Sequence, residues 1–290
     1  MKKINILILA ITSLALFSCK TDEKKTEETP VENVQQHKIV SLNGAITEII
    51  AALGHENEIV GVDVTSTFPE SVKTTAKDIG HVRSLSIESI VALKPTVILA
   101  TDKDLSPELA EKIKNAGIEA HIFTQDFSVE GTKKLIEEVA GVLKNNDFKK
   151  LQEKIDTDLA KVQKIEKAPK VLFIYARGAG TLMVAGKNTP IEKTIALAGG
   201  ENAITAFEDF KPLTPESLIQ GNPDVILLFT SGLQSLGGVD GLLKVPGVEK
   251  TNAGKNKKII ALDGGLLSGF GPRVGEAATS LNGLLLENVK

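Results

Sequence analysis

The segments LSIESI (residues 85–90) and LTPESL (residues 213–218) share one pattern, and they decide the fold that we expect. In each segment a hydroxyl residue precedes a short helical pattern with a glutamate in its first turn, Glu88 in one copy and Glu216 in the other. Each copy continues through a proline into a strand pattern, PTVIL and PDVIL. The offset between the copies is constant, because the caps, the glutamates and the prolines are all separated by the same length of chain. We therefore expect one supersecondary unit in each of two similar lobes, with a ligand site between the lobes.

The composition and net charge limit the molecules that this chain could bind and the chemistry that it could perform. A chain of 290 residues with 42 % hydrophobic content can bury two ordinary cores, and a net charge of −3 gives no support for nucleic-acid binding. The single cysteine, Cys19, excludes a disulfide within the chain and a cysteine metal cage. The four histidines have no helix-face metal spacing, and no nucleophile or paired-carboxylate arrangement suits catalysis. We predict a protein that is not an enzyme.

The first residues have the form of a secretory signal. Two lysines precede an apolar run over residues 4–16, which is too short for a permanent membrane span, and the run ends in LFSC. This ending predicts a lipoprotein signal peptide over residues 1–19, with Cys19 carrying the lipid; the alternative is an ordinary signal peptide with an incidental cysteine. Residues 20–37 are rich in Lys, Glu, Thr and Asp and are predicted to form a disordered tether. The folded body is then extracytoplasmic and is held at the membrane only by its lipid anchor.

Strand and helix patterns alternate after the tether. In the first lobe they predict strands over 38–42, 58–62, 97–101 and 118–123 and helices over 107–115 and 129–143. In the second lobe they predict strands over 170–175 and 258–263 and a helix over 190–198. The predicted fold is therefore α/β, with two Rossmann-like lobes, 38–144 and 169–290, that each contain a mostly parallel central sheet.

Residues 145–168 lie between the two lobes. They contain no Gly or Pro, and apolar residues recur every three or four positions, which predicts one long amphipathic helix of about 30 Å. Such a connector would restrict how far the lobes swing apart; the alternative is a surface helix within one domain. Tyr175 ends the strand that follows, where we expect it to point into the core, and a glycine-rich loop (176–180) comes next.

Arginine is scarce in this chain. Only three of the 34 basic residues are arginines, and Arg83, Arg177 and Arg273 each lie in or beside a loop at the predicted mouth of a lobe. A guanidinium group binds carboxylates through a planar fork and stacks on flat π systems. The arginines thus favour an anionic or planar ligand; alternatively, each caps a helix or pairs with a nearby acid.

Several motifs together resemble a known family. KIVSL (38–42) with Thr47 and Glu48, GVDVTS (61–66), the repeated ES segments and GFGPR (269–273) are similar to the haem-binding proteins of bacterial haem ABC importers, a branch of the iron-siderophore and cobalamin class. MVAG (183–186) and LGGVDG (236–241) are more particular to the haem branch. The resemblance covers about residues 38–290. It implies a monomer that captures haem as a transported ligand and delivers it to an ABC permease dimer with ATPase subunits; the alternative is cobalamin or a ferric siderophore.

The resemblance also implies residue roles on the outer surface. In the class, one glutamate on each lobe pairs with arginines of the permease, and Glu88 and Glu216 match these positions.

Within the ligand site, the sequence departs from the family pattern. Relatives usually place an iron-binding tyrosine before the proline that follows Asp-x-Thr-Ser, and here that residue is Phe68. The next loop of relatives carries Gly-Tyr where this chain has Gly-His, so the resemblance implies His81 as axial ligand of the haem iron, with Phe68 packing on the porphyrin. Arg177 would reach a propionate, and Arg83 and Arg273 would contact propionates or form pocket walls.

Overall fold

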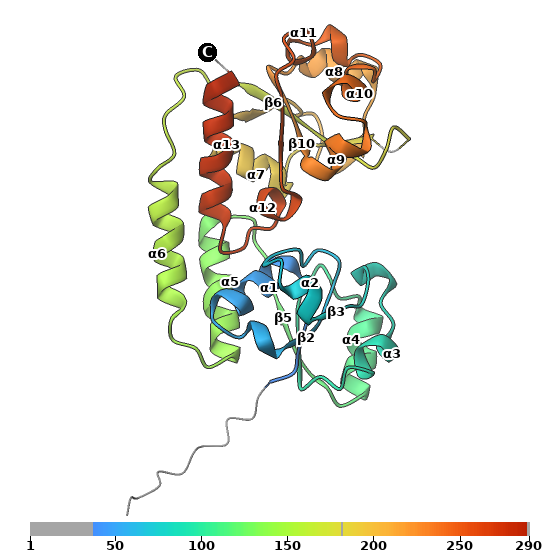
Figure 1. Cartoon of the computed structure of the whole chain (residues 1–290), viewed down its shortest axis with the longest axis vertical. Helices are drawn as coiled ribbons and strands as arrows, with labels where there is room; N and C mark the ends of the chain where they lie inside the picture. Colours follow the sequence, from blue (N-terminus) through green and yellow to red (C-terminus); the bar gives the residue numbers. More distant parts are fainter. Residues whose placement is uncertain (1–36, 181, 289–290) are drawn as a thin grey trace, which may run out of the picture. The chain divides into compact units, whose positions relative to one another are not determined.

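The computed structural model describes residues 37–180 and 182–288 (Figure 1). The predicted signal peptide, Cys19 and all but the last residue of the tether lie outside the described residues. Within the described ranges, no helix has the length and hydropathy needed to cross a bilayer.

The first sheet has five strands in the order β3-β2-β1-β4-β5, and every neighbouring pair is parallel. Alternate residues of β4 face opposite ways, so that Leu99 packs under one helical layer and Ile98 under the other. Because both faces are buried, the strand is a continuous apolar run. The strands are β1 (Ile39–Ser41), β2 (Ile59–Val62), β3 (Lys77–Asp78), β4 (Val97–Thr101) and β5 (Glu119–Phe123).

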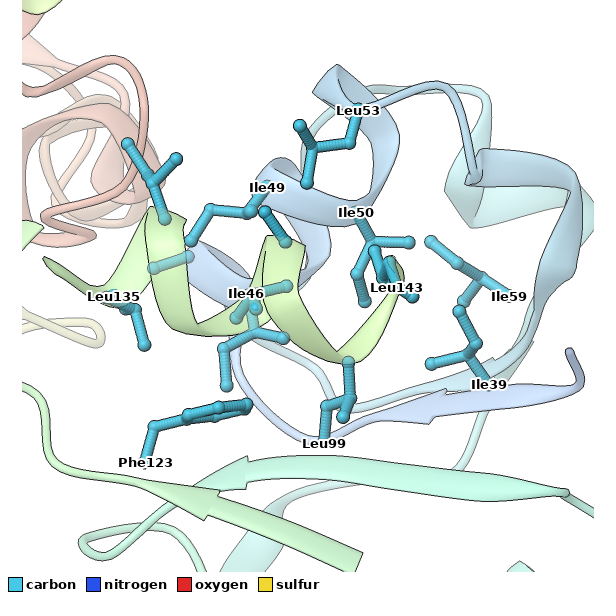
Figure 2. Packing of buried hydrophobic residues seen from close by; sticks show 14 of the residues in the cluster. Ile39, Ile46, Ile49, Ile50, Leu53, Ile59, Leu99, Phe123, Leu135 and Leu143 are labelled. Atoms are coloured by element: carbon cyan, nitrogen blue, oxygen red, sulfur yellow. The ribbon is translucent and has the colours of Figure 1, made fainter. Parts of the chain in front are cut away.

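Five α-helices belong to residues 37–144, which we call the first half of the chain. The part that contains the second sheet, from residue 169 onward, is called the second half. Figure 2 shows how Ile46, Ile49 and Ile50 pack with Leu135 above the strands, in the cluster that we call the first core. These isoleucines recur at helical spacing, which explains why the segment forms an amphipathic helix. The helices are α1 (Gly44–Ala52), α2 (Val72–Thr75), α3 (Ile87–Val91), α4 (Pro107–Asn115) and α5 (Val129–Val142).

The second sheet is mixed. β10 pairs in parallel with β6 and β11, and β8 also runs parallel to β6, whereas β7 is antiparallel to both β6 and β9. The glycine-rich loop returns the chain directly from β6 into β7, and Gly178 takes the positive φ of 67° that this turn requires. The strands are β6 (Lys170–Ala176), β7 (Leu182–Ala185), β8 (Glu201–Asn202), β9 (Phe210–Pro212), β10 (Val225–Phe229) and β11 (Ile259–Leu262).

Helices cover both faces of this sheet as well, so the predicted α/β fold is confirmed. One layer packs on Phe173 and Leu227, and the other packs on Leu172 and Ile226. The helices are α7 (Pro190–Leu197), α8 (Pro215–Gly221), α9 (Thr230–Ser235), α10 (Val239–Leu243), α11 (Asn252–Lys255), α12 (Gly264–Ser268) and α13 (Val274–Asn288).

The sequence repeat corresponds to a structural repeat. Ser86 and Thr214 cap α3 and α8, and each side chain accepts a hydrogen bond of 3.2 Å from the backbone N–H three residues later. After these helices, Lys94 and Asn222 both adopt positive φ, at 49° and 32°. Both pairs keep the constant offset of the two sequence copies, so α3 and α8 are equivalent elements.

The helix between the two halves is shorter than the sequence predicts. α6 spans Phe148–Leu159, which is 12 residues, whereas the pattern predicts a helix through 145–168. Asn282 of α13 explains the early end, because its side chain accepts a bond of 3.0 Å from the Gln163 N–H and donates one of 2.8 Å to the Gln163 carbonyl. These bonds hold Gln163 outside any helix, although the local sequence would allow one. α6 packs against both α5 and α13 (Figure 1).

Residues 263–274, which we call the strap, tie the two halves together. Phe270 and Val274 are buried in the first core, although they follow the last strand of the second sheet. Gln125 donates a hydrogen bond of 3.0 Å to the Gly269 carbonyl, and Thr132 donates one of 3.2 Å to the Phe270 carbonyl. The first core is therefore completed by residues from the end of the chain.

Candidate functional site

Two of the pockets where the first half meets the second share one residue, Ser268. The first pocket, of about 300 Å³, lies between the start of α1, the 65–67 loop and the strap. The apolar pocket, of about 410 Å³, is formed almost wholly by the second half; its lining is Tyr175, Met183, Pro190, Ile191, Phe210, Phe229, Ser268 and, from the first half, Arg83. Both volumes fall in the range of small-molecule sites.

Strand pairing builds the aromatic wall of the apolar pocket. Tyr175 lies opposite Met183 in the antiparallel pair of β6 and β7, so the two side chains share one face of the sheet. Phe229 ends β10 next to them, and its ring centroid lies 6.1 Å from that of Tyr175. Tyr175 and Phe229 thus stand at the carboxyl ends of adjacent parallel strands, where α/β sheets place their ligands.

Arg83 is the one charged side chain among the described residues that line the apolar pocket. It lies in the short 3₁₀ turn over Val82–Ser84 and is exposed. No carboxylate of the described residues forms a salt bridge with it. A flat apolar ligand with a carboxylate at its edge would therefore meet aromatic surface and one guanidinium group.

His81 caps the turn that carries Arg83. Its Nδ1 accepts a hydrogen bond of 3.1 Å from the Arg83 N–H, and the side chain is exposed. A neutral imidazole whose Nδ1 is an acceptor carries its proton on Nε2. Iron coordination through Nε2 would require this bond to break and the proton to move to Nδ1, and would therefore change the cap of the turn.

Phe68 and Arg273 lie against each other where the two halves of the chain meet. The Arg273 guanidinium carbon lies 3.8 Å from the centroid of the Phe68 ring, which is 43 % exposed. Two nitrogens of Arg273 bond the Glu48 carboxylate, one of them Nε at 2.9 Å from Oε2. Burial raises the pKa of Glu48, and the hydrogen bonds from Arg273 limit the rise. Because its charge is already paired, Arg273 fits the predicted wall role better than the predicted propionate role.

Asp63 positions the loop that carries Phe68. The carboxylate is 2 % exposed and accepts hydrogen bonds from the Thr65 N–H (3.0 Å), the Thr65 hydroxyl (2.7 Å) and the Ser66 hydroxyl (2.9 Å). Burial raises its pKa, and these hydrogen bonds oppose the rise. The Asp-x-Thr-Ser motif therefore fixes the backbone just before Phe68.

Of the predicted site residues, only Arg83 lines either pocket, and His81, Phe68 and Arg273 line neither. Arg177 is exposed in the loop after β6 and lines neither pocket. Glu88 and Glu216 are exposed in the first turns of α3 and α8. A hydrogen bond from its own backbone and one from the Ser86 side chain lower the pKa of Glu88, which is thus ionised at neutral pH.

The aromatic wall of the apolar pocket could not be assigned from the sequence. Tyr175 was expected in the core, yet it is half-buried and lines the apolar pocket. Its position at the carboxyl end of a parallel strand was the available signal. Met183 lies in the MVAG motif, which was noted without a role, and Phe210 and Phe229 gave no signal, because their place depends on how β6, β7, β9 and β10 assemble.

Metal binding by a cluster of side chains is not indicated. Among residues 37–180 and 182–288, no group of three or more His, Cys, Asp or Glu side chains could hold an ion. Iron that arrives within a macrocycle would need only an axial ligand or two from the protein.

Solved structures of similar sequence share this fold. The periplasmic haem-binding protein RhuT from Roseiflexus sp. RS-1, in apo form, is 40 % identical with a TM-score of 0.84, covering 88 % of this chain and 100 % of that one. The periplasmic haem-binding protein BhuT, in complex with two haems, is 32 % identical with a TM-score of 0.82, covering 88 % and 99 %. The haem-binding protein HmuT is 29 % identical with a TM-score of 0.78, covering 86 % and 84 %, and it has also been solved with a tyrosine, a histidine or an arginine replaced by alanine.

Two curated relatives are more distant. The uncharacterised ABC transporter substrate-binding lipoprotein YvrC of Bacillus subtilis (strain 168) is 27 % identical over 281 residues, which is 92 % of this chain and 85 % of the relative. The vitamin B12-binding protein of Vibrio vulnificus (strain CMCP6) is 25 % identical over 243 residues, covering 81 % and 85 %. The model of the periplasmic binding protein family matches residues 39–265, and the chain belongs to this family.

Proposed function

We propose that this chain is the substrate-binding lipoprotein of a bacterial ABC importer, that it binds haem in the apolar pocket, and that it delivers haem to a permease dimer with ATPase subunits. The observation that carries the proposal is the apolar pocket itself, with four aromatic or sulfur-containing side chains and Arg83 at its edge. Haem is a flat apolar macrocycle with carboxylates along one edge. Its ring matches the aromatic lining, and its carboxylates match the arginine. The haem-binding names of the solved relatives support the same assignment.

The iron ligands that we propose are His81 from the first half and Tyr175 from the second. In HmuT, the names of the alanine variants put the tyrosine two residues before the arginine, at 240 and 242, and the histidine at 141. Tyr175 and Arg177 have the same spacing here, and His81 precedes them by a similar length of chain. Arg83 lines the same pocket as Tyr175, whereas His81, Phe68, Arg177 and Arg273 line neither pocket and would contact the part of the haem that extends beyond it.

Cobalamin is the second candidate, because curated relatives carry the name vitamin B12-binding protein. Its peripheral groups are mostly amides with a single phosphodiester, whereas haem offers two propionate carboxylates to an arginine at the pocket edge. Arg83 and the haem-binding structures therefore favour haem.

A titration with ferric haem tests the proposal. The chain would carry Cys19→Ser so that no lipid is attached, and absorption spectra would be recorded for this protein and for His81→Ala and Tyr175→Phe. We expect saturable binding, a changed iron spectrum in each variant, and affinity lowered by at least the roughly 10- to 100-fold that losing a ligand's supporting group costs. His121 is a matched control, because it already bonds Glu119 outside both pockets, and His121→Ala should bind as the parent does.

Two outcomes would count against the assignment. Saturable binding of cobalamin without haem binding would move the ligand to the second candidate. Haem binding with an unchanged spectrum in both variants would retain haem and reject these two iron ligands.

We further propose that the lipid on Cys19 holds the chain at the outer side of the cell membrane, as a monomer on a tether formed by residues 20–37. Membership of the family and the lipoprotein YvrC support this location. Metabolic labelling with a fatty acid should mark the parent and spare Cys19→Ser.

A further inference from the structure

Two exposed aliphatic side chains occupy equivalent positions of the structural repeat. Val91 in α3 is 44 % exposed and Ile219 in α8 is 53 % exposed. They are separated by the same length of chain as Glu88 and Glu216. Isolated exposed hydrophobic side chains are ordinary, but here an aliphatic side chain is exposed at both copies of one position.

Each aliphatic side chain accompanies one of the two acids. Val91 follows Glu88 by three residues, and Ile219 follows Glu216 by three, so each pair shares one helix face. The preceding residues, Ile90 and Leu218, are fully buried. In each helix, therefore, one aliphatic side chain is buried in the core, and the aliphatic side chain of the next residue is exposed to solvent beside a carboxylate. We call Glu88 with Val91, and Glu216 with Ile219, the docking pairs.

The chemistry of the docking pairs selects the kind of partner. A second copy of this chain, meeting these same surfaces, would bring acid against acid, which is unfavourable. A partner that offers a basic side chain beside an apolar recess would match each pair. Two equivalent pairs on one chain need two equivalent recesses, which a two-fold symmetric dimer provides.

We propose that Val91 and Ile219 are docking residues for the permease dimer, each inserting into an apolar recess next to the basic side chain that meets Glu88 or Glu216. This inference rests on the proposed function. Charged groups mainly accelerate the encounter, whereas buried apolar area slows dissociation. The acids would then guide the loaded protein to the permease, and the aliphatic side chains would set how long it stays.

The test measures binding to a permease–ATPase complex in nanodiscs, chosen because the haem-loaded protein stimulates its ATP hydrolysis. Val91→Ala, Ile219→Ala and the double variant remove apolar area and keep helix-forming residues. We expect dissociation to become about tenfold faster in either single variant and about 100-fold faster in the double variant, with smaller effects on association. Ile122→Ala is the matched control, because Ile122 is 48 % exposed on β5 and is not part of the repeat.

The possible outcomes separate this inference from the proposed function. If the variants bind haem normally but dissociate from the complex no faster than Ile122→Ala, the docking inference is wrong and the proposed function stands. If no haem binds and no complex is stimulated, the proposed function itself fails. If sedimentation shows a dimer of the parent chain that Ile219→Ala dissociates, a second copy covers this surface and the permease assignment is overturned.

Discussion

At the scale of single residues, Asp63 controls the loop before Phe68. Asp63→Ala would leave the Thr65 N–H and two hydroxyl groups without their acceptor, and we expect the free energy of unfolding to fall by about 1–3 kcal/mol. Urea unfolding measures this change. Asp63→Asn keeps an acceptor oxygen and should lose less; an equal loss in both variants would show that charge, not hydrogen bonding, holds the loop.

The raised pKa of Asp63 gives a second expectation for the same pair of proteins. A carboxyl whose pKa is higher in the folded state stabilises the fold fully below its unfolded pKa, about 3.9, and loses this contribution as the pH rises through the folded pKa. The stability of the parent relative to Asp63→Asn should therefore be greater at pH 3.5 than at pH 7. The reverse trend in urea unfolding would contradict the burial effect.

Sequence patterns located some site residues and could not locate others. His81 and Arg83 stand close together in the chain, and the local turn that His81 caps brings Arg83 to the apolar pocket. The partnership of Arg273 with Glu48 joins positions near opposite ends of the folded chain, so no local pattern reveals that its charge is already paired. The contacts of His81, Phe68 and Arg177 with the ligand stay predictions, of which the titration tests the one made by His81.

At the scale of secondary structure, close packing of α6 and α13 depends on Gly275. A Cβ atom at this position would lie 2.8 Å from both the Asp158 Cβ and the Ile155 carbonyl oxygen. Gly275→Ala should push the helices apart and lower the free energy of unfolding by about 1–3 kcal/mol. Thermal unfolding would measure the loss.

Gly283 is the matched control on the same helix. Nothing lies within 4 Å of a Cβ placed there, so Gly283→Ala should stabilise the protein by about 0.5–1 kcal/mol through helix propensity. Similar losses in both variants would mean that helix contact at Gly275 is not the cause.

The sequence predicted the limits of a helix well where residues within or next to the helix cap its ends. α4 begins and ends at the predicted residues, because Ser106 caps it and Pro107 occupies its first turn. α6 lacks a side-chain cap hydrogen bond at its start, and Asn282 captures the chain after its end. The limits of α6 therefore depend on tertiary contacts that the local sequence does not contain.

At the scale of the whole molecule, the pairing of Glu48 with Arg273 joins the two halves across the junction. Both side chains are mostly buried, at 8 % and 15 % exposure. Glu48→Ala would leave the guanidinium without its partner, and we expect the free energy of unfolding to fall by about 3–5 kcal/mol in urea unfolding.

A double variant sharpens this prediction. Glu48→Leu with Arg273→Met replaces the ion pair by apolar side chains and should recover most of the stability. If the losses of the single changes simply add, the two residues do not act as a pair. Glu108→Ala, which breaks an exposed pair with Lys112, should cost less than about 1 kcal/mol and serves as the control.

The strap also has a consequence for the order in which the protein folds. The ribosome completes α5 long before Phe270 and Val274 leave it, so the first core remains unfinished for several seconds of synthesis, at roughly 5–20 residues per second. During that interval its apolar surface is open to chaperones and to the secretion machinery. This delay would favour export of the chain in an unfolded state, because the first core is not complete until Phe270 and Val274 have been synthesised.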